Sequence, residues 1–529
     1  MTEFTGAAAL LRLILRRDRL GLLIWIALVS LAPIAIASSF IQLYPTAAAL
    51  EAVADASMRT PTTIGMLGVV YSPTVGGLVA WRSGLQSAIL IGTVSLLLVI
   101  RHTRGEEETG RRELLGATVV GRLAPLAAAL IAVLGANLVI AALITGGLIG
   151  LGLPAAGSLA LGLSAGAVGW VCAAAGGVAA QLSERAGAAR GIGLAAFGAA
   201  YMVRIIGDTA GRESGWSWLS WLSPLGWARL TRAFAGERWP VFALFLGLTV
   251  ALITAAFALV ARRDLGAGLL PTRPGPAASS SLRSPLALAW RLHRGALIAW
   301  TTAAAVFGGL LGAVGQSFSA YVDNAQMSAW AARMGARDAG DAFLFLTMYV
   351  LGQIAAAYAI SAALRMRAEE TDGRADPVLA AAVSRLRWAG GHLFFATIGP
   401  LVALLTLGLM IGLGYGLSAG DLARNLPRLL ARTLATLPAV WVMAGLATAL
   451  YGLAPRLAVA GSWALLAAFL ILELGWELQQ ISQGVFDISP FAHVHWANPV
   501  TATPLIELSA IAALLIAAGL VGFRRRDLS

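Results

Sequence analysis

The chain has 529 residues, of which 58% are hydrophobic and only 12% are charged, and its formal net charge is +12. Apolar runs of about 20 residues recur along it, and each can cross a bilayer once as a helix. Continuous runs such as 87–100 do not alternate in polarity, which excludes a membrane barrel of strands. The positive charge lies between the apolar runs, where it indicates membrane orientation and not a nucleic acid partner. The composition therefore predicts an all-α, polytopic membrane protein.

The N-terminal segment 4–19 has leucine and isoleucine on one helical face and arginine on another. This pattern predicts an amphipathic helix that lies on the membrane surface. The apolar stretch that follows, 20–40, contains Ala35-Ile36-Ala37, which imitates a signal-peptidase site. Because the stretch is longer than the core of a signal peptide, we expect an uncleaved first span.

The apolar runs predict six spans in each half of the chain. An even number per half gives both halves the same orientation, so we expect twelve transmembrane helices arranged as two parallel six-helix repeats. The expected domains are a first half at 1–265, a flexible cytoplasmic linker rich in Gly, Pro and Ser at 266–285, and a second half at 286–529. The expected spans are 20–40, 80–100, 122–148, 157–181, 191–207, 240–260, 295–316, 343–364, 389–416, 433–453, 459–476 and 504–523.

The placement of arginine orients these spans, since all 38 basic residues are arginines. With the N-terminus inside the cell, roughly 25 of them fall in cytoplasmic segments, which fits the positive-inside rule. We therefore expect a multi-pass protein of the inner (plasma) membrane whose N- and C-termini are both cytoplasmic.

A dense charged segment occurs twice. RHTRGEEETGRRELL at 101–115, the first charged segment, returns 263 positions later as LRMRAEETDGRADPV at 364–378, the second charged segment. The positive-inside rule explains the arginines, but acidic residues contribute little to topology. We therefore expect each segment to dock into a partner through charge-assisted hydrogen bonds, with a solvated loop as the alternative. The candidate ATPase-coupling residues are Arg104, Glu106, Glu107, Gly110 and Arg111, and their copies Arg367, Glu369, Glu370, Gly373 and Arg374.

Two shorter patterns also repeat. The sequence RRDL closes the first half at 262–265 and the second half at 525–528, again 263 positions apart. A Ser-Pro pair flanked by tryptophans precedes the last span of each half, at 223–224 and 489–490. These outer segments can dip into the membrane as half-helices or lie at the interface as loops, and both readings stay open.

Residue types limit the chemistry of the chain. A nucleotide-binding P-loop needs a lysine, which this sequence lacks, so ATP and its Mg²⁺ would have to bind a separate protein. The spacing of His493 and His495 could suit a metal, but no cysteine or carboxylate cluster supports one. Two Gly-x-Ser-x-Gly matches lack the strand, turn and helix of a hydrolase. We expect no catalytic residue, metal or cofactor on this chain.

Ionisable residues inside the spans are rare. Arg204 in the fifth span and Glu473 in the eleventh occupy roughly corresponding places, where an unpaired charge would be costly. We hypothesise that they form an intramembrane charge pair across the axis that relates the halves. The alternative is that each caps a helix end or contacts lipid headgroups.

The two charged segments, GWARLTRAF at 226–234 and GFRRRDL at 522–528 together resemble a known family. They look like bacterial type-2 ABC exporter permeases of the fused, twelve-span kind, often called polyketide-antibiotic or tetronasin-resistance exporters. The resemblance spans essentially the whole chain, and the repeated E-E-x-x-G-R pattern is its most specific part.

This resemblance implies a transport subunit, not an enzyme, that works with a separate ABC ATPase. The ATPase is usually present as two copies, binds ATP and Mg²⁺, and powers the export of lipophilic compounds such as antibiotics, other drugs or lipids. The resemblance also implies that 4–19 is a connecting helix, that the charged segments are coupling helices, and that the Ser-Pro segments are re-entrant. Thr371 and Asp372 replace Glu108 and Thr109, so the two docking surfaces are not expected to be equivalent.

The function expected is therefore that of an ATP-driven export permease in the cell membrane. The alternative is a proton-coupled secondary multidrug carrier with two six-helix halves, which needs carboxylates inside the membrane, and Glu473 is the plausible one. A membrane enzyme acting on lipid is a third class, without a convincing catalytic set. The substrate does not follow from the sequence, because apolar walls also face lipid.

Overall fold

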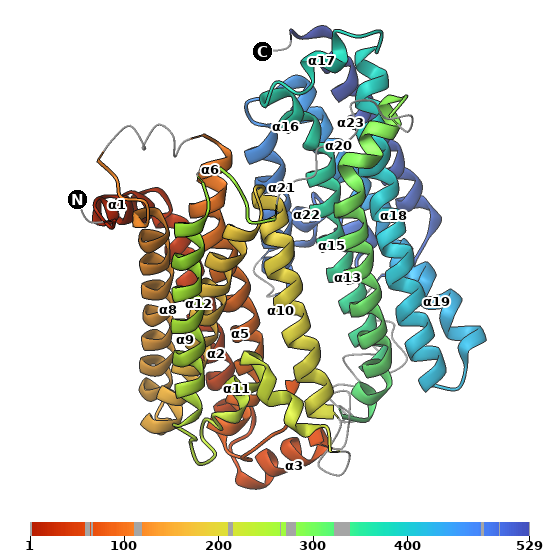
Figure 1. Ribbon diagram of the computed structural model, residues 1–529. Coiled ribbons are helices and arrows are strands. Elements are labelled where there is room, and N and C mark those ends of the chain that lie inside the picture. The colour runs from red at the N-terminus through yellow and green to blue at the C-terminus, as the bar shows by residue number, and fades with distance from the viewer. Residues whose placement is uncertain are drawn as a thin grey trace. The chain divides into compact units, whose positions relative to one another are not determined.

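The computed structural model describes residues 3–58, 64, 67–110, 119–209, 215–264, 266–270, 282–321, 339–477, 481–496 and 498–527. Within this part of the chain every regular element is a helix. Contacts divide the chain into two compact units, Met1–Gly275 and Pro276–Ser529 (Figure 1). Among the predicted site residues, Arg111 lies outside the described residues.

The first unit combines long apolar helices with short connecting ones. Its long helices are α2 (Arg19–Leu43), α5 (Val75–Ile100), α8 (Ala124–Gly150), α9 (Ala155–Leu182), α10 (Ala186–Thr209) and α12 (Val241–Arg262). Its short elements are α1 (Ala7–Arg17), α3 (Ala47–Met58), the π-helical turn η1 (Arg101–Gly105), α6 (Glu106–Glu108), the 3-10 helix η2 (Ser217–Leu222) and α11 (Pro224–Leu230).

The second unit repeats this plan with different short elements. Its long helices are α13 (Pro285–Tyr321), α15 (Ala339–Ala363), α18 (Arg385–Ser418), α20 (Leu437–Leu453), α21 (Ala458–Glu477) and α23 (Ala502–Arg525). Its short elements are α16 (Arg365–Thr371), α17 (Asp376–Leu379), α19 (Leu422–Leu434), α22 (Gln483–Phe486) and the 3-10 helix η3 (Ala492–Val494).

Each predicted span falls on one of these long helices. Among the described residues, 11 helices are long and apolar enough to cross a membrane. The remaining predicted span, 459–476, corresponds to α21, whose apolar stretch Ala458–Glu473 is shorter. The prediction of an all-α, polytopic membrane protein is confirmed, and the reason is that long apolar runs must satisfy their own backbone hydrogen bonds.

Small residues let the helices of each unit approach closely. In the first unit α9 packs against α5, α8 and α12, and a Cβ atom at Gly162 would lie 2.5 Å from the carbonyl oxygen of Ala141 in α8. In the second unit α20 packs on α23, where a Cβ at Gly452 would lie 1.9 Å from the carbonyl oxygen of Gly519. Such contacts between helix backbones supply the packing that holds helices together in lipid.

The N-terminal amphipathic segment forms α1, which lies against the start of α8. The amide of Gly121 donates to the carbonyl oxygen of Thr5 at 2.9 Å, and the amide of Leu123 donates to that of Glu3 at 3.0 Å. These bonds tie α1 to the chain that leaves the first charged segment.

Candidate functional site: the two charged segments

Both charged segments begin as a continuation of the preceding span. In the first unit α5 runs through η1 into α6, and the chain then turns at Gly110, whose φ is 70°. In the second unit α15 leads into α16, and the chain turns at Gly373, whose φ is 67°. A left-handed residue after a helix is usually glycine, because side chains are strained there. The repeated glycine therefore ends the same helical extension in both halves.

The second glutamate of each pair forms a buried ion pair within its own unit. The carboxylate of Glu107 accepts two hydrogen bonds from Nη2 of Arg263, at 2.9 and 3.0 Å. The carboxylate of Glu370 accepts from Nη1 and Nη2 of Arg526, at 2.7 and 2.6 Å. Both glutamate side chains are only 2% exposed. The partners are 156 residues apart in each case, so the same ion pair is built twice.

A second contact to the same arginines is also repeated. Arg122 donates to the carbonyl oxygen of Arg263, and Arg385 donates to the carbonyl oxygen of Arg526 at 2.7 Å. Arg263 and Arg526 directly follow the last helix of their units, α12 and α23. Each last helix is therefore tied both to a charged segment and, through Arg122 or Arg385, to the chain that follows that segment. We call these sets of three residues the first anchor (Glu107, Arg122 and Arg263) and the second anchor (Glu370, Arg385 and Arg526).

The two arginines that pair with the buried glutamates, Arg263 and Arg526, remain charged. Burial lowers the pKa of Arg526, but the hydrogen bond and the negative charge of Glu370 outweigh burial and raise that pKa above its ordinary value. Burial lowers the pKa of Arg263, yet an arginine starts from so high a value that it stays protonated. Each anchor thus contains a charge-assisted ion pair with two hydrogen bonds, and the pair of Glu370 with Arg526 has the parallel geometry, with one bond from each terminal nitrogen, that is strongest for these groups.

The first glutamates of the two pairs are used differently. Glu106 pairs with Arg17, at the end of α1, at 2.6 Å. Glu369 instead pairs with Arg365 and Arg374 of its own segment, each at 2.9 Å. Positions that match in sequence therefore have different partners, and in the first unit this pair links the charged segment to α1.

The first arginines of the segments differ as well. The guanidinium of Arg104 is completely buried, lies 2.9 Å from Glu107, and donates to the carbonyl oxygens of Ala180 and Ala267, each at 2.9 Å. Its copy, Arg367, is partly exposed and lies 3.9 Å from the carboxylate of Glu370. The first segment is thus packed into its unit more deeply than the second.

These contacts show what the predicted coupling residues do inside the chain. The carboxylates of the four glutamates take part in internal ion pairs, whereas Arg374 and Asp372 are each about half exposed. The role of these residues in docking a partner stays a prediction. Sequence reasoning missed the partners of Glu107 and Glu370, although the shared 263-residue offset of the glutamates and of the RRDL repeats pointed to them.

The two ionisable residues predicted inside the spans have partners within their own units. Arg204 is buried in α10 and pairs with Asp208 at 2.5 Å. Glu473 is buried in α21 and accepts hydrogen bonds from Gln353 and, at 3.2 Å, from the hydroxyl of Tyr349. The pairing of Arg204 with Glu473 stays a prediction.

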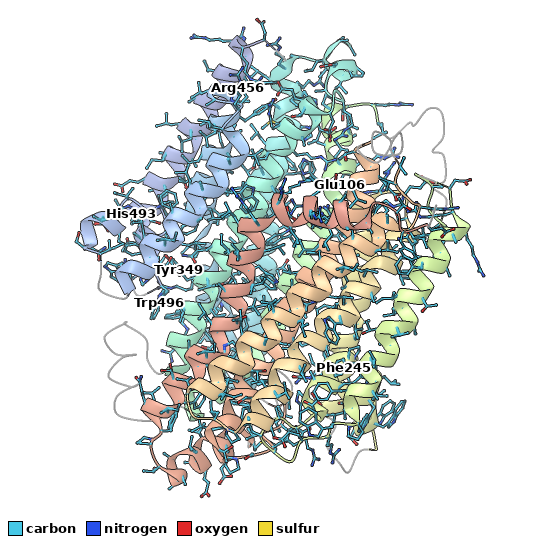
Figure 2. The ribbon with its side chains drawn as sticks, turned by 90° about the vertical axis from the view of Figure 1, so that its left-hand side faces the viewer. Glu106, Phe245, Tyr349, Arg456, His493 and Trp496 are labelled. Atoms are coloured by element: carbon cyan, nitrogen blue, oxygen red, sulfur yellow. The ribbon has the colours of Figure 1, made fainter. Side chains whose placement is uncertain are left out.

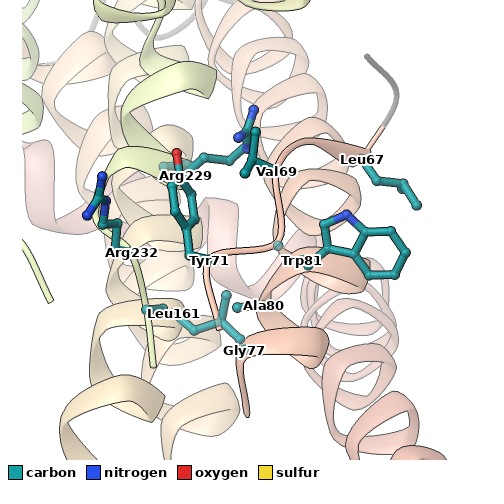
Figure 3. Close-up of a pocket in the computed structure, with 12 residues that line it drawn as sticks. Leu67, Val69, Tyr71, Gly77, Ala80, Trp81, Leu161, Arg229 and Arg232 are labelled. Atoms are coloured by element: carbon teal, nitrogen blue, oxygen red, sulfur yellow. The ribbon is translucent and has the colours of Figure 1, made fainter. Parts of the chain in front are cut away.

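Asp208 also connects α10 to a small pocket beside the first Ser-Pro segment. It accepts a hydrogen bond from Arg229 of α11. Arg229 and Arg232 lie over the ring of Tyr71, with 5.8 and 4.9 Å between guanidinium carbon and ring centroid (Figure 3). The cavity among these side chains is about 30 Å³, which holds about one water molecule and not a drug.

The second Ser-Pro segment leads into an aromatic cluster around His495. The rings of Tyr349 and Trp476 each lie 5.1 Å from that of His495, and the ring of Trp496 lies 5.4 Å away. Figure 2 shows Tyr349 and Trp496 close together at one side of the ribbon. Because Tyr349 also donates to Glu473, the buried carboxylate and the aromatic cluster form one connected network.

Comparison with known proteins identifies the family. The chain is 41% identical over 531 aligned residues to the multidrug efflux system permease protein Rv1217c of Mycobacterium tuberculosis (strain ATCC 25618 / H37Rv), an alignment that covers 99% of this chain and 95% of the relative. Residues 282–524 match the family model described as the C-terminal domain of the multidrug efflux system permease Rv1217c. The chain therefore belongs to the family of the multidrug efflux system permease Rv1217c.

Proposed function

We propose that this chain is the membrane permease of an ATP-driven exporter of lipophilic compounds, such as antibiotics, other drugs or lipids. A separate ABC ATPase, present as two copies, would bind ATP and Mg²⁺ and contact the two charged segments. The proposal places the protein in the inner (plasma) membrane, with both termini and both charged segments in the cytoplasm. The name of the relative supports efflux of drugs, and the absence of lysine supports a separate ATPase.

The single observation that carries the proposal is the repetition of the anchor. In each half a buried Glu–Arg pair holds the charged segment against the end of the last helix, and an arginine in the chain that follows the segment donates a hydrogen bond to the same helix end. Two segments braced in the same way suit two copies of one partner. A solvated loop that served only membrane topology would not need buried glutamates.

The anchors also supply a route for force. A partner that pushed on a charged segment would move the last helix of that half, because Glu107 and Glu370 are bonded to the residues that end α12 and α23. Closure of the two ATPase copies around ATP would then tilt helices that meet through small residues and can slide. Rearrangement of helices in each half would open the path for the substrate.

Exposed charges are the groups available to a partner. In the second segment Arg374 and Asp372 are exposed, and in the first segment Arg101 is 47% exposed. We expect the partner to contact these side chains, while the buried glutamates hold the segment in place. Because the two sets of exposed charges differ, the two ATPase copies would dock with unequal affinity.

The first test distinguishes exposed charges that bind the ATPase from buried glutamates that hold the segment in place. The tagged full-length permease would be purified with its co-expressed ATPase, as wild type and as Asp372→Arg, a substitution that leaves the pair of Arg374 with Glu369 in place. We expect the variant to retain less ATPase while keeping its unfolding temperature. The control is Arg387→Glu, at an exposed arginine of α18, which should leave ATPase binding intact. Equal ATPase binding by wild type and Asp372→Arg would contradict the docking surface.

Energy dependence tests the proposed mechanism itself. Vesicles containing the permease and the ATPase would be loaded with a lipophilic fluorescent dye, and efflux measured with ATP, with a non-hydrolysable ATP analogue, and with a protonophore. We expect efflux that requires ATP hydrolysis and survives the protonophore. Efflux that stops with the protonophore and ignores ATP would overturn the proposal.

The second candidate function, a proton-coupled carrier, rests on Glu473. This buried carboxylate has hydroxyl and amide partners through Tyr349 and Gln353, a setting in which a proton can be held inside a membrane protein. A Glu473→Gln variant distinguishes the two functions. Loss of efflux with retained folding, together with protonophore sensitivity of the wild type, would favour the carrier.

A further inference from the structure

A pocket of about 570 Å³ opens in the second unit beside the second charged segment. It lies between the α15–α16 junction and the link that joins α20 to α21. Three arginines line it, Arg365, Arg367 and Arg456, together with Thr371, Val459 and Trp463. Figure 2 shows Arg456 at the far end of the unit from Trp496, so this pocket is distinct from the aromatic cluster around His495.

The pocket carries more positive charge than its neighbours neutralise. Arg365 shares the carboxylate of Glu369 with Arg374. Arg367 lies 3.9 Å from Glu370, whose two oxygens already accept from Arg526. Arg456 is exposed and has no hydrogen bond or ion pair with any residue that the structure describes. The surplus charge would attract an anion.

In the first unit the region that corresponds to this pocket, around Arg104, is covered by other parts of the chain. Arg104, the copy of Arg367, is bonded to the carbonyl oxygens of Ala180 and Ala267. The chain at 266–270 covers this place, because the amides of Leu269 and Leu270 donate to the end of α9, at 3.1 and 2.9 Å. In the second unit no residue of the described part covers Arg367 in this way.

The first unit also has carboxylates where the second has none. Glu108 accepts a hydrogen bond from the amide of Ala186 at 2.9 Å, and its copy in the second segment is Thr371. Glu184 lies in the link between α9 and α10, and Pro455 stands in the matching link between α20 and α21. Carboxylates thus offset the positive charge around Arg104 in the first unit, whereas the pocket around Arg367 in the second unit stays basic.

The side of the pocket that faces along α21 is apolar. Val459 is 52% exposed, Trp463 is 40% exposed, and Leu457 in the adjoining link is 60% exposed. These side chains lie near the end of an apolar helix, where tryptophan and arginine favour the boundary between lipid and water. A ligand with an anionic head and a hydrocarbon tail would satisfy both sides of the pocket.

We propose that this pocket binds the headgroup of an anionic membrane phospholipid. The phosphate would lie between Arg456 and Arg367, and the acyl chains would run along α21 past Val459 and Trp463. Basic pockets between membrane helices recognise lipid headgroups through this combination of charge and apolar surface. The proposal does not depend on ATP-driven transport, since it concerns only what the permease binds at its membrane boundary.

The test measures retained lipid on the purified full-length chain by native mass spectrometry. Phosphatidylglycerol and phosphatidylcholine with identical acyl chains would be supplied in detergent, with inorganic phosphate as a competitor. Arg456→Gln should weaken retention of phosphatidylglycerol about fivefold, the loss expected for one arginine near a membrane surface. Thr371→Glu, which restores the carboxylate of the first unit, should weaken it at least as much.

The matched control is Arg185→Gln. Arg185 is an exposed arginine in the α9–α10 link, the counterpart of the link that carries Arg456, and its substitution should leave retention unchanged. Unfolding temperatures would verify that all variants are folded. Equal retention by Arg456→Gln and wild type, or equal binding of both lipids, would overturn the proposal. Displacement of phosphatidylglycerol by millimolar phosphate alone would reassign the pocket to a free anion and equally refute the lipid site.

Discussion

The second anchor gives the sharpest prediction about stability. Glu370→Gln keeps the shape of the side chain but removes its charge, so Arg526 loses its partner next to Arg367. Loss of one partner of a buried ion pair costs about 3–5 kcal/mol. The side chain of Arg526 is 15% exposed, so water can solvate part of its charge. We therefore expect a loss near the lower end of that range, about 3 kcal/mol.

The assay is thermal unfolding of the purified permease in detergent. For a unit of about this size, a loss of 3 kcal/mol lowers the unfolding temperature by roughly 6–12 °C. The matched control is Glu106→Gln, because its pair with Arg17 is partly exposed and such pairs contribute about 0–1 kcal/mol. A similar drop in unfolding temperature for Glu106→Gln and Glu370→Gln would show that burial of the ion pair does not increase its contribution to stability.

A double-mutant cycle isolates the pair itself. Glu370→Gln, Arg526→Gln and the double variant should give a coupling free energy of about 2 kcal/mol, within the range for residues in one ion-pair network. Additive losses in unfolding free energy would refute the idea that this contact braces the segment. In the transport assay, the complex of Glu370→Gln with the partner ATPase should continue to hydrolyse ATP while exporting less dye.

Three further predictions concern other parts of the chain. Asp208→Asn should destabilise the first unit by about 3 kcal/mol, since Arg204 is buried and would lose its charged partner. An Asp208→Asn variant that unfolds at the wild-type temperature would contradict this prediction. Gly452→Ala should lower the free energy of unfolding by about 1–3 kcal/mol, because the added methyl group overpacks α20 against α23. The control is Gly135→Ala, whose added methyl group meets open space and should not lower the unfolding temperature in the same experiment. Gly373→Ala should cost about 1 kcal/mol because φ is 67° there, and chemical unfolding that shows no loss would argue against the left-handed turn.

The anchors explain why the charged segments repeat so closely. A segment that only carried positive charge could change its glutamates freely, but Glu107 and Glu370 each have a fixed partner at the end of a helix. The glutamates before them have no such common geometry, since Glu106 binds α1 and Glu369 binds its own segment. The contacts that the two segments share are thus concentrated in the anchors, and the segments differ in the partners of the first glutamate and in the burial of the first arginine.

The sequence was sufficient to predict the helices and their approximate limits. Apolar runs of span length can only be helical in lipid, and arginine and glycine mark where they end. The repeat at a spacing of 263 residues also followed from the sequence, together with the residues that have copies. These features are local, so each can be read from a short stretch of chain.

Only the tertiary structure decided which charges are partners and which are exposed. The Glu107–Arg263 and Glu370–Arg526 pairs join residues 156 positions apart, and their contact depends on how each unit places the extension of its second long helix beside the end of its last helix. Arg104 and Arg367 have equivalent positions in the repeat, yet one is buried under 266–270 and the other lines an open pocket. Burial of a charge is set by the segments that fold over it, and those segments lie far away along the chain.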